Sequence, residues 1–255
     1  MTTRALTRAV PDSIARCELT HLTRKPIDID LARAQHAAYE DALRAAGCVV
    51  ERVVAMPDAP DSVFVEDTAI VLDDIAVITR PGAASRRREV ESVAAALGPH
   101  RELLHIEAPA TIDGGDVLRV GRRLFVGLST RTNADAVEQL HTALDARGYD
   151  LVPVIVRGVL HLKSAVTQVG ASQLLVNRDW IDVGPFRDCD LIEVDPLEPS
   201  AANALLVRET VLFPSEFPRT AERLERSGVQ LVRVAASELA KAEGALTCCS
   251  LVVET

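Results

Sequence analysis

A unit of two β-rich runs, a polar loop and an amphipathic helix is repeated along this chain. Residues 63–80 hold two β-rich runs, and residues 81–97 supply a loop and a helix that we expect to be capped near Ser85. Residues 116–127 and 128–148 repeat the same order. A period of about 50 residues is typical of folds built from repeated supersecondary units.

Further copies extend the pattern towards both ends of the sequence. Residues 161–177 and 203–228 predict a third and a fourth unit. A helix expected at 29–46 belongs to a fifth, which we complete by pairing the N-terminal segment with the final strand in 248–254. One unit is too small to bury its own strands, so the copies are expected to assemble with strands inside and helices outside.

The repeats therefore predict a single α/β domain over residues 1–255. A chain of 255 residues that is 48% hydrophobic can bury a core of the required size. The sequence contains no Pro/Ser-rich linker, and residues 184–200 form the one stretch long and polar enough to be an excursion from the repeat.

Charge and hydropathy exclude several classes of function. The net charge of −9 argues against a nucleic-acid partner, which requires clustered Lys and Arg. The N-terminal residues lack the apolar core of a signal peptide, and no apolar run is long enough to span a membrane. We expect a cytoplasmic protein whose five cysteines stay reduced, and we interpret three of them as buried packing residues: Cys17, Cys48 and Cys189.

Polar residues interrupt the apolar pattern at four places. The first place holds Asp61, Glu66 and Asp67, and the second holds Asp113 and Asp116 around Gly114-Gly115. The third is His161, and the fourth is the pair Cys248 and Cys249 in "GALTCCS". Each has a structural alternative, because carboxylates solvate strand ends, Asp-Gly favours hairpin turns, and a histidine between two leucines is often a core residue. An isolated thiol can equally be buried and inert.

Together these residues indicate a site with a nucleophile. A cysteine, a histidine and a carboxylate suit thiol catalysis in which a third group orients the acid/base partner. The remaining carboxylates would then bind a cation. A zinc site formed by Cys248, Cys249 and His161 is the competing interpretation, although the usual C-x-x-C spacing is absent.

Several motifs, in order and spacing, resemble one enzyme family. The motifs are "FVEDTAIV", "ITRPGAASRRREV", "TIDGGDVL", "FVGLSTRTN", "VLHLKS", "AAN" at 201–203 and "GALTCCS". From about residue 8 to the C-terminus, the chain is similar to the dimethylarginine dimethylaminohydrolases of the guanidine-modifying (amidinotransferase) superfamily. The resemblance implies a five-bladed α/β propeller, or pentein, of pseudo-repeated ββαβ units, which agrees with the repeats.

The resemblance also implies a reaction and its catalytic residues. The reaction is hydrolysis of Nω,Nω-dimethyl-L-arginine or Nω-monomethyl-L-arginine to L-citrulline and dimethylamine or methylamine, through a covalent S-alkylthiouronium on cysteine. By position, Cys248 corresponds to the nucleophile, with Cys249 packing behind it. His161 corresponds to the general acid/base, and Asp113 to the acidic residue that accompanies it.

Substrate contacts follow from the same resemblance. The resemblance implies that Glu66 and Asp67 hold the guanidinium group and that Asp61 meets the α-amino group. It implies that Arg86 and Arg131 bind the α-carboxylate. Leu19 corresponds to a lid residue, and the backbone near Ala242 to a contact with the amino group. The resemblance implies no metal and no cofactor, with zinc as an inhibitor at Cys248 and His161. The partner is a small methylated arginine, and a homodimer is compatible with the resemblance.

Three alternatives stay open at this point. The nearest is an arginine deiminase-like hydrolase, because the sequence does not reveal the shape of the pocket around the methyl groups. The others are a non-catalytic methylarginine-binding protein and a zinc-regulated thiol protein.

Overall fold

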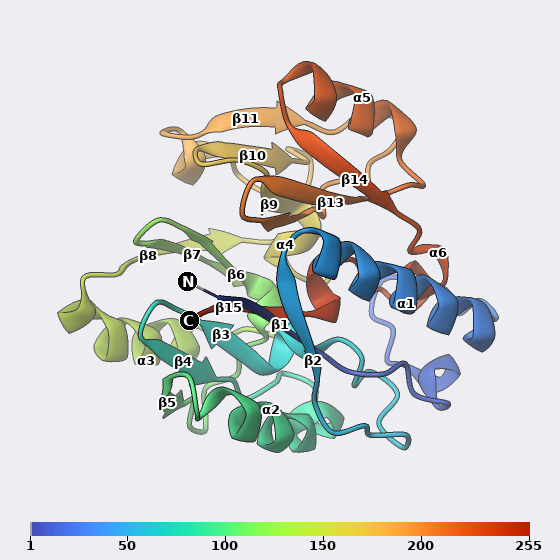
Figure 1. Cartoon of the computed structure of the whole chain (residues 1–255). Helices are drawn as coiled ribbons and strands as arrows, with labels where there is room; N and C mark the ends of the chain where they lie inside the picture. The colour runs from blue at the N-terminus through green and yellow to red at the C-terminus, as the bar shows by residue number, and fades with distance from the viewer. Residues whose placement is uncertain (1) are drawn as a thin grey trace.

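The computed structural model describes residues 2–255 and contains five three-stranded sheets. The longer helices lie at the periphery and the strands in the interior (Figure 1). In chain order the sheets comprise β1 (Thr3–Thr7), β2 (Cys48–Arg52) and β15 (Leu251–Glu254); β3 (Ala69–Val71), β4 (Ile75–Ile78) and β5 (Glu102–His105); β6 (Val117–Val120), β7 (Arg123–Leu128) and β8 (Asp150–Ile155); β9 (Val166–Gln168), β10 (Gln173–Val176) and β11 (Asp190–Glu193); β12 (Leu205–Val207), β13 (Thr210–Pro214) and β14 (Gln230–Val234).

Each sheet has the same internal order. An antiparallel hairpin is followed by a connection and a third strand parallel to the second, as in β3–β4–β5 and β6–β7–β8. Parallel neighbours need such a crossover because a tight turn can only reverse the chain. The connecting helices are α1 (Ile29–Ala45), α2 (Val90–Leu97), α3 (Ala134–Leu144) and α5 (Pro218–Arg226). The predicted mixed α/β class is confirmed, and the sheets that contain β3, β6 and β12 have the full ββαβ order.

The two ends of the chain share the first sheet. β15 pairs antiparallel with β1, and β2 lies parallel to β1 on its other side. The backbone N–H of Thr2 donates to the carbonyl of Thr255 at 2.6 Å, and Thr255 returns the bond at 2.8 Å. The termini consequently lie side by side (Figure 1). The predicted pairing of the last strand with the N-terminal segment is confirmed.

The fourth sheet departs from the predicted pattern. Residues 177–189, all of which the structure describes, hold the single turn η6 (Gly184–Phe186) where other sheets have an α-helix. Phe186 is buried and its ring lies 4.3 Å from that of Phe125. β11 also falls within 184–200, so the prediction of an excursion there is wrong: charged residues at both ends of this four-residue strand conceal its apolar centre.

A second correction concerns the helix predicted to be capped near Ser85. The chain first forms the 3₁₀ segment η3 (Ala84–Glu89), and α2 begins at Val90 without a side-chain cap. The Ser85 hydroxyl donates instead to the carboxylate of Glu18 in a distant loop. The Ser85 side chain therefore makes a tertiary contact in place of the helix cap that the local sequence predicts.

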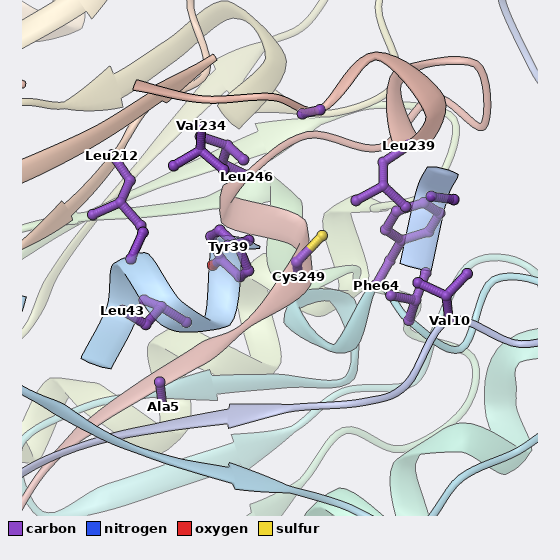
Figure 2. Close-up of a cluster of buried hydrophobic side chains, with 14 of the residues drawn as sticks. Ala5, Val10, Tyr39, Leu43, Phe64, Leu212, Val234, Leu239, Leu246 and Cys249 are labelled. Atoms are coloured by element: carbon purple, nitrogen blue, oxygen red, sulfur yellow. The ribbon is translucent and has the colours of Figure 1, made fainter. Parts of the chain in front are cut away.

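The core around the C-terminal turn shows how the last cysteine is used. Cys249 is fully buried among Tyr39, Phe64 and Leu239 (Figure 2), and its thiol donates to the carbonyl of Ala245 at 3.4 Å. This burial fits the expectation that the second cysteine packs behind the first. No helix within residues 2–255 has both the length and the apolar character needed to cross a membrane.

Candidate active site

Short turns precede the first strand of every sheet and meet at the centre of the molecule. Four are helical: η2 (Val65–Thr68), η4 (Gly114–Asp116), α4 (Leu162–Ala165) and η7 (Thr247–Cys249); the fifth is the loop 201–204 before β12. Because the units are repeats, equivalent turns arrive at one place, which brings together polar residues far apart in sequence.

Hydrogen bonds join each of these turns to the next, and we call them the central ring. In order they are Gly115 N–H to Asp67 Oδ1 (3.1 Å), Leu162 N–H to Asp116 Oδ1 (2.9 Å), Asn203 Nδ2 to the Lys163 carbonyl (3.0 Å), Thr247 N–H to Asn203 Oδ1 (3.1 Å) and Thr247 Oγ1 to Glu66 Oε2 (2.8 Å). The ring closes on η2, where it began.

The paired glycines of η4 permit this close approach. A Cβ on Gly114 would lie 2.0 Å from the Glu66 carbonyl oxygen, and one on Gly115 would lie 2.6 Å from His161 Nδ1. Side chains at these positions would force apart the turns that carry Asp67 and His161. The Gly-Gly pair is therefore a packing requirement of the site, in addition to being a turn signal.

On one side of the ring lies a narrow pocket of about 20 Å³, which we call the catalytic pocket. Eight residues predicted from the sequence line it: Asp61, Asp67, Arg86, Asp113, Arg131, His161, Ala242 and Cys248. The other lining residues are Glu18, Phe64, Leu160, Glu243 and Gly244. The structure thus gathers a thiol, an imidazole, five carboxylate residues and two arginines around one small space.

His161 stands at the N-terminus of α4, buried among carboxylates. Its Nε2 lies 3.0 Å from Asp113 Oδ2 and its Nδ1 lies 3.8 Å from Asp67 Oδ1. Burial disfavours the charged ring, but Asp67, Asp113 and Asp116 outweigh that effect and raise the pKa of His161 to about 9. The imidazole is therefore protonated at neutral pH and is equipped to act as an acid.

Cys248 has the opposite resting state. Burial, together with the negative charges of Glu66 and Asp67, raises the pKa of its thiol well above the usual range. The free protein consequently holds a thiol, and a positive charge must enter beside it before a thiolate becomes favourable.

Asp67 and Arg86 form a buried pair on the pocket wall. Arg86 Nη1 donates to Asp67 Oδ2 at 2.5 Å, and Nη2 donates to Glu89 at 2.9 Å and to the carbonyls of Asp61 and Phe64. Burial works against the carboxylate, but His161 and Arg86 keep the pKa of Asp67 below its ordinary value. Asp67 therefore supplies a permanent negative charge beside His161.

A comparison with known protein families agrees with this constellation. The family model described as arginine deiminase matches residues 6–183. The chain belongs to the arginine deiminase family.

Within this family, relatives match over almost the whole chain. The N(G),N(G)-dimethylarginine dimethylaminohydrolase of Streptomyces coelicolor is 40% identical, covering 97% of this chain and 96% of that protein. The enzyme of the same name from Pseudomonas aeruginosa is 37% identical, covering 87% and 89%. A structure of the Pseudomonas enzyme, as a cysteine-to-serine variant in complex with citrulline, matches with a TM-score of 0.94 at 32% identity, covering 99% and 100%.

Two of the site residues predicted from the sequence lie outside the lining of the catalytic pocket. Glu66 faces the other side of the central ring, where it accepts from Lys163 Nζ at 2.5 Å and from Thr247. A larger cavity of about 610 Å³ lies on that side, and Glu66 and Lys163 both line it. Leu19 packs against the core cluster that contains Cys249.

Several residues that shape the site were not predicted from the sequence. Asn203 and Lys163 lie within the quoted "AAN" and "VLHLKS" motifs, so the signal was present but carried no role. Thr247 precedes Cys248 in the chain, and its hydroxyl donates to Glu66. Glu18 and Glu243 reach the pocket from irregular loops, where no periodicity marks a residue as inward-facing.

The catalytic pocket also contains a group able to hold a metal ion. Single ligand atoms of Asp67, Asp113 and His161 lie within 4.8 Å of one another. Two carboxylates and an imidazole suit a divalent cation. These residues already bind one another and Arg86: Asp113 contacts the His161 ring, and Asp67 contacts the Arg86 guanidinium. The set differs from the zinc site considered from the sequence, which used Cys248.

Proposed function

We propose that this protein hydrolyses Nω,Nω-dimethyl-L-arginine and Nω-monomethyl-L-arginine to L-citrulline and the corresponding amine. The observation that carries the proposal is the meeting of Cys248, His161, Asp113 and Asp67 in one pocket of a chain similar throughout its length to dimethylarginine dimethylaminohydrolases. A thiol, a charged imidazole and a fixed carboxylate are the groups that substitution at a guanidinium carbon requires.

Binding of the substrate prepares both reactants. We propose that Asp67 holds the guanidinium so that its central carbon faces Cys248. The same cation offsets the negative charges that keep the thiol protonated, so binding of the positively charged substrate is coupled to release of the thiol proton to solvent. A neutral ligand of equal shape would lack this effect.

His161 then serves first as an acid and afterwards as a base. The Cys248 thiolate attacks the guanidinium carbon, and the bond to dimethylamine breaks as His161 transfers its proton to the departing nitrogen. The product on the enzyme is an S-alkylthiouronium. Neutral His161 next takes a proton from water, whose oxygen attacks the same carbon, and cleavage of the C–S bond releases citrulline and regenerates the cysteine.

We propose that Asp113 positions His161 through the 3.0 Å contact with Nε2 and helps to maintain its charge. For the amino-acid end, Asp61 is assigned to the α-amino group, with the backbone at Ala242 beside it, and Arg131 to the α-carboxylate. Arg131 offers the planar fork that suits a carboxylate. Arg86 is assigned to the same carboxylate and must exchange some of its present contacts to reach it.

The remaining assignments complete the proposal. Glu66 is assigned an indirect role at the guanidinium through the central ring, and Leu19 a covering role above the substrate. We propose one catalytic domain over residues 1–255 that acts without a metal or cofactor in the cytoplasm, with zinc inhibiting at Cys248 and His161. A homodimer is included as a proposal. Metal analysis of the purified protein, turnover with added zinc, and sedimentation test these points.

Arginine deiminase activity is the second candidate, favoured by the family model that matches residues 6–183. The same cysteine, histidine and carboxylates would release ammonia from arginine in place of dimethylamine. What separates the two activities is the space around the terminal nitrogen atoms.

The deciding experiment measures citrulline from dimethylarginine, monomethylarginine and arginine at equal concentrations. We expect product from the methylated substrates, and a fall of about 10³-fold or more in Cys248→Ser. Cys249→Ala is the matched control and should retain activity, because that neighbour lies in the core. Citrulline chiefly from arginine would indicate a deiminase, and none from any substrate would contradict both candidates.

A further inference from the structure

Residues 18–22, which we call the covering segment, contact residues that line the catalytic pocket: Asp61, Arg131 and Glu243. The pocket of about 20 Å³ leaves room for about one ordered water molecule. Glu18 belongs to this segment and lines the pocket. A substrate therefore has to displace part of the protein, and the contacts of Glu18 identify which part.

Glu18 makes two kinds of contact at one end of the catalytic pocket. Its backbone N–H donates to both carboxylate oxygens of Asp61, at 3.3 and 3.2 Å. Its carboxylate lies 3.8 Å from Arg131 Nη1 and accepts the hydroxyl of Ser85. One residue thus presents an N–H donor to a buried carboxylate and a carboxylate to an arginine.

This is the arrangement that the amino-acid end of a substrate would adopt. An α-amino acid carries an N–H donor group and a carboxylate on one carbon. The proposed function assigns the same two partners, Asp61 and Arg131, to those two groups. Glu18 reproduces both contacts from within the chain.

We propose that Glu18 is an internal competitor for the amino-acid end of the substrate and thereby sets the affinity of the enzyme for substrates that carry an α-carboxylate. The inference rests on the proposed function for the assignment of Asp61 and Arg131. Displacement requires the Glu18 side chain, which is 44% exposed, to leave Arg131 and its backbone N–H to move away from Asp61.

A separate clamp holds the rest of the covering segment. The carboxylate of Glu243 accepts the backbone N–H groups of Thr20, His21 and Leu22, at distances of 2.6 to 3.1 Å. Glu243 adopts a positive φ of 57°, which few residues other than glycine adopt. Thr20 also accepts a hydrogen bond from Arg131 Nη2 at 3.2 Å, but only Glu18 places a carboxylate beside Arg131. The Glu243 clamp and the Glu18 carboxylate can therefore be altered separately.

The expected effect is modest because the competing ion pair is partly solvated. Pairs of this exposure shift an equilibrium by about fivefold at most. Removing the Glu18 carboxylate should therefore lower KM for dimethylarginine by about two- to fivefold. It should leave kcat within about twofold, because the residue has left its partners before the chemistry begins.

The test uses Glu18→Gln with two substrates that differ only in the α-carboxylate, namely dimethylarginine and its decarboxylated analogue, Nω,Nω-dimethylagmatine. The variant should lower KM for the first and leave KM for the second unchanged, since only the first competes for Arg131. An unchanged or raised KM for dimethylarginine would overturn the inference, as would an equal change for both substrates.

Glu243→Gln is the matched control. It weakens the cover without removing the competing carboxylate, so both KM values should change together. The two hypotheses fail in different ways: a wild-type protein without turnover contradicts the proposed function, whereas an active enzyme with an unaltered KM ratio contradicts the competitor alone. Calorimetric binding of L-arginine and agmatine to wild type and Glu18→Gln measures the same ratio without catalysis.

Discussion

Two buried histidines of this protein share a carboxylate contact at Nδ1 but differ at Nε2 and in charge state. Nε2 of His161 lies 3.0 Å from Asp113, whereas Nε2 of His36 has no hydrogen-bond partner within residues 2–255. His36 in α1 is 2% exposed and His161 is 4% exposed. Each has Nδ1 at 3.8 Å from a carboxylate oxygen, on Glu40 for His36 and on Asp67 for His161. Yet burial lowers the pKa of His36 to about 4, while that of His161 is raised to about 9.

The difference lies in what else binds the carboxylates. Glu40 accepts two bonds from Arg52, at 2.8 and 2.7 Å, and a third from Thr7. Its charge is largely balanced, and the Arg52 cation itself disfavours a second positive charge on His36. Around His161 the carboxylates of Asp67, Asp113 and Asp116 exceed the balancing charge of Arg86. An excess of buried negative charge and the hydrogen bond to Asp113, rather than burial, separate the candidate acid from the core histidine.

The largest expected effect is on catalysis. His161→Gln should reduce kcat by about 10² to 10⁴-fold, because general acid catalysis contributes effects of this size. His36→Gln should leave kcat within about twofold. Steady-state turnover of dimethylarginine by the two variants measures the contrast, and comparable losses in both would contradict the assignment of His161 as the acid.

Opposite pH dependences of stability form the second test. Folding lowers the pKa of His36, so its contribution to the free energy of unfolding is present above about pH 6.5. This contribution, about 3 kcal/mol, is lost as the pH falls through 4. The pKa of His161 is raised, so its contribution is present below about pH 6.5 and is lost as the pH rises through 9.

Urea unfolding of the wild type and of the two glutamine variants, from pH 4 to 9, measures the slope of the free energy of unfolding against pH. The acid-side slope should diminish in His36→Gln, and the alkaline-side slope should diminish in His161→Gln. If either variant loses the slope assigned to the other, the comparison between the two sites is wrong.

The smallest expected effect comes from removing one carboxylate. Asp113→Asn should lower the pKa of His161 from about 9 while leaving it above that of His36, because Asp67 and Asp116 remain. We expect kcat to fall by about tenfold as positioning and charge weaken together. NMR titration of the imidazole Cε1–H measures the pKa, and a value equal to the wild type would show that Asp113 adds little charge stabilisation.

The sequence was sufficient for the parts of this molecule governed by repetition and by chemistry. The ββαβ order and the pairing of β15 with β1 follow from alternating and helical patterns. A cysteine, a histidine and a carboxylate form a recognisable set, and the family resemblance then pointed to Cys248, His161 and Asp113, which the structure brings into one pocket. The fourth sheet was hidden because its connection, η6, lacks helical periodicity.

Side-chain direction within the turns was beyond the sequence. Glu66 and Asp67 are adjacent, but successive residues of a 3₁₀ turn point about 120° apart. Glu66 therefore meets Lys163 on one side of the central ring, and Asp67 meets Arg86 on the other. Glu18 was missed for a related reason, since its contacts depend on how an irregular segment crosses the pocket.

The pairing of β15 with β1 also governs when the protein can become active during synthesis. Thr3 faces Glu254 across that pair, so the first sheet joins residues from opposite ends of the sequence. Contacts of such separation form late, and a chain emerging from the ribosome can complete its other sheets while the edge of β1 stays unpaired. Cys248 lies in η7, the turn before this closing strand. The thiol to which we assign the nucleophilic role therefore reaches the pocket as the fold is sealed, and we expect a nascent chain to lack activity until then.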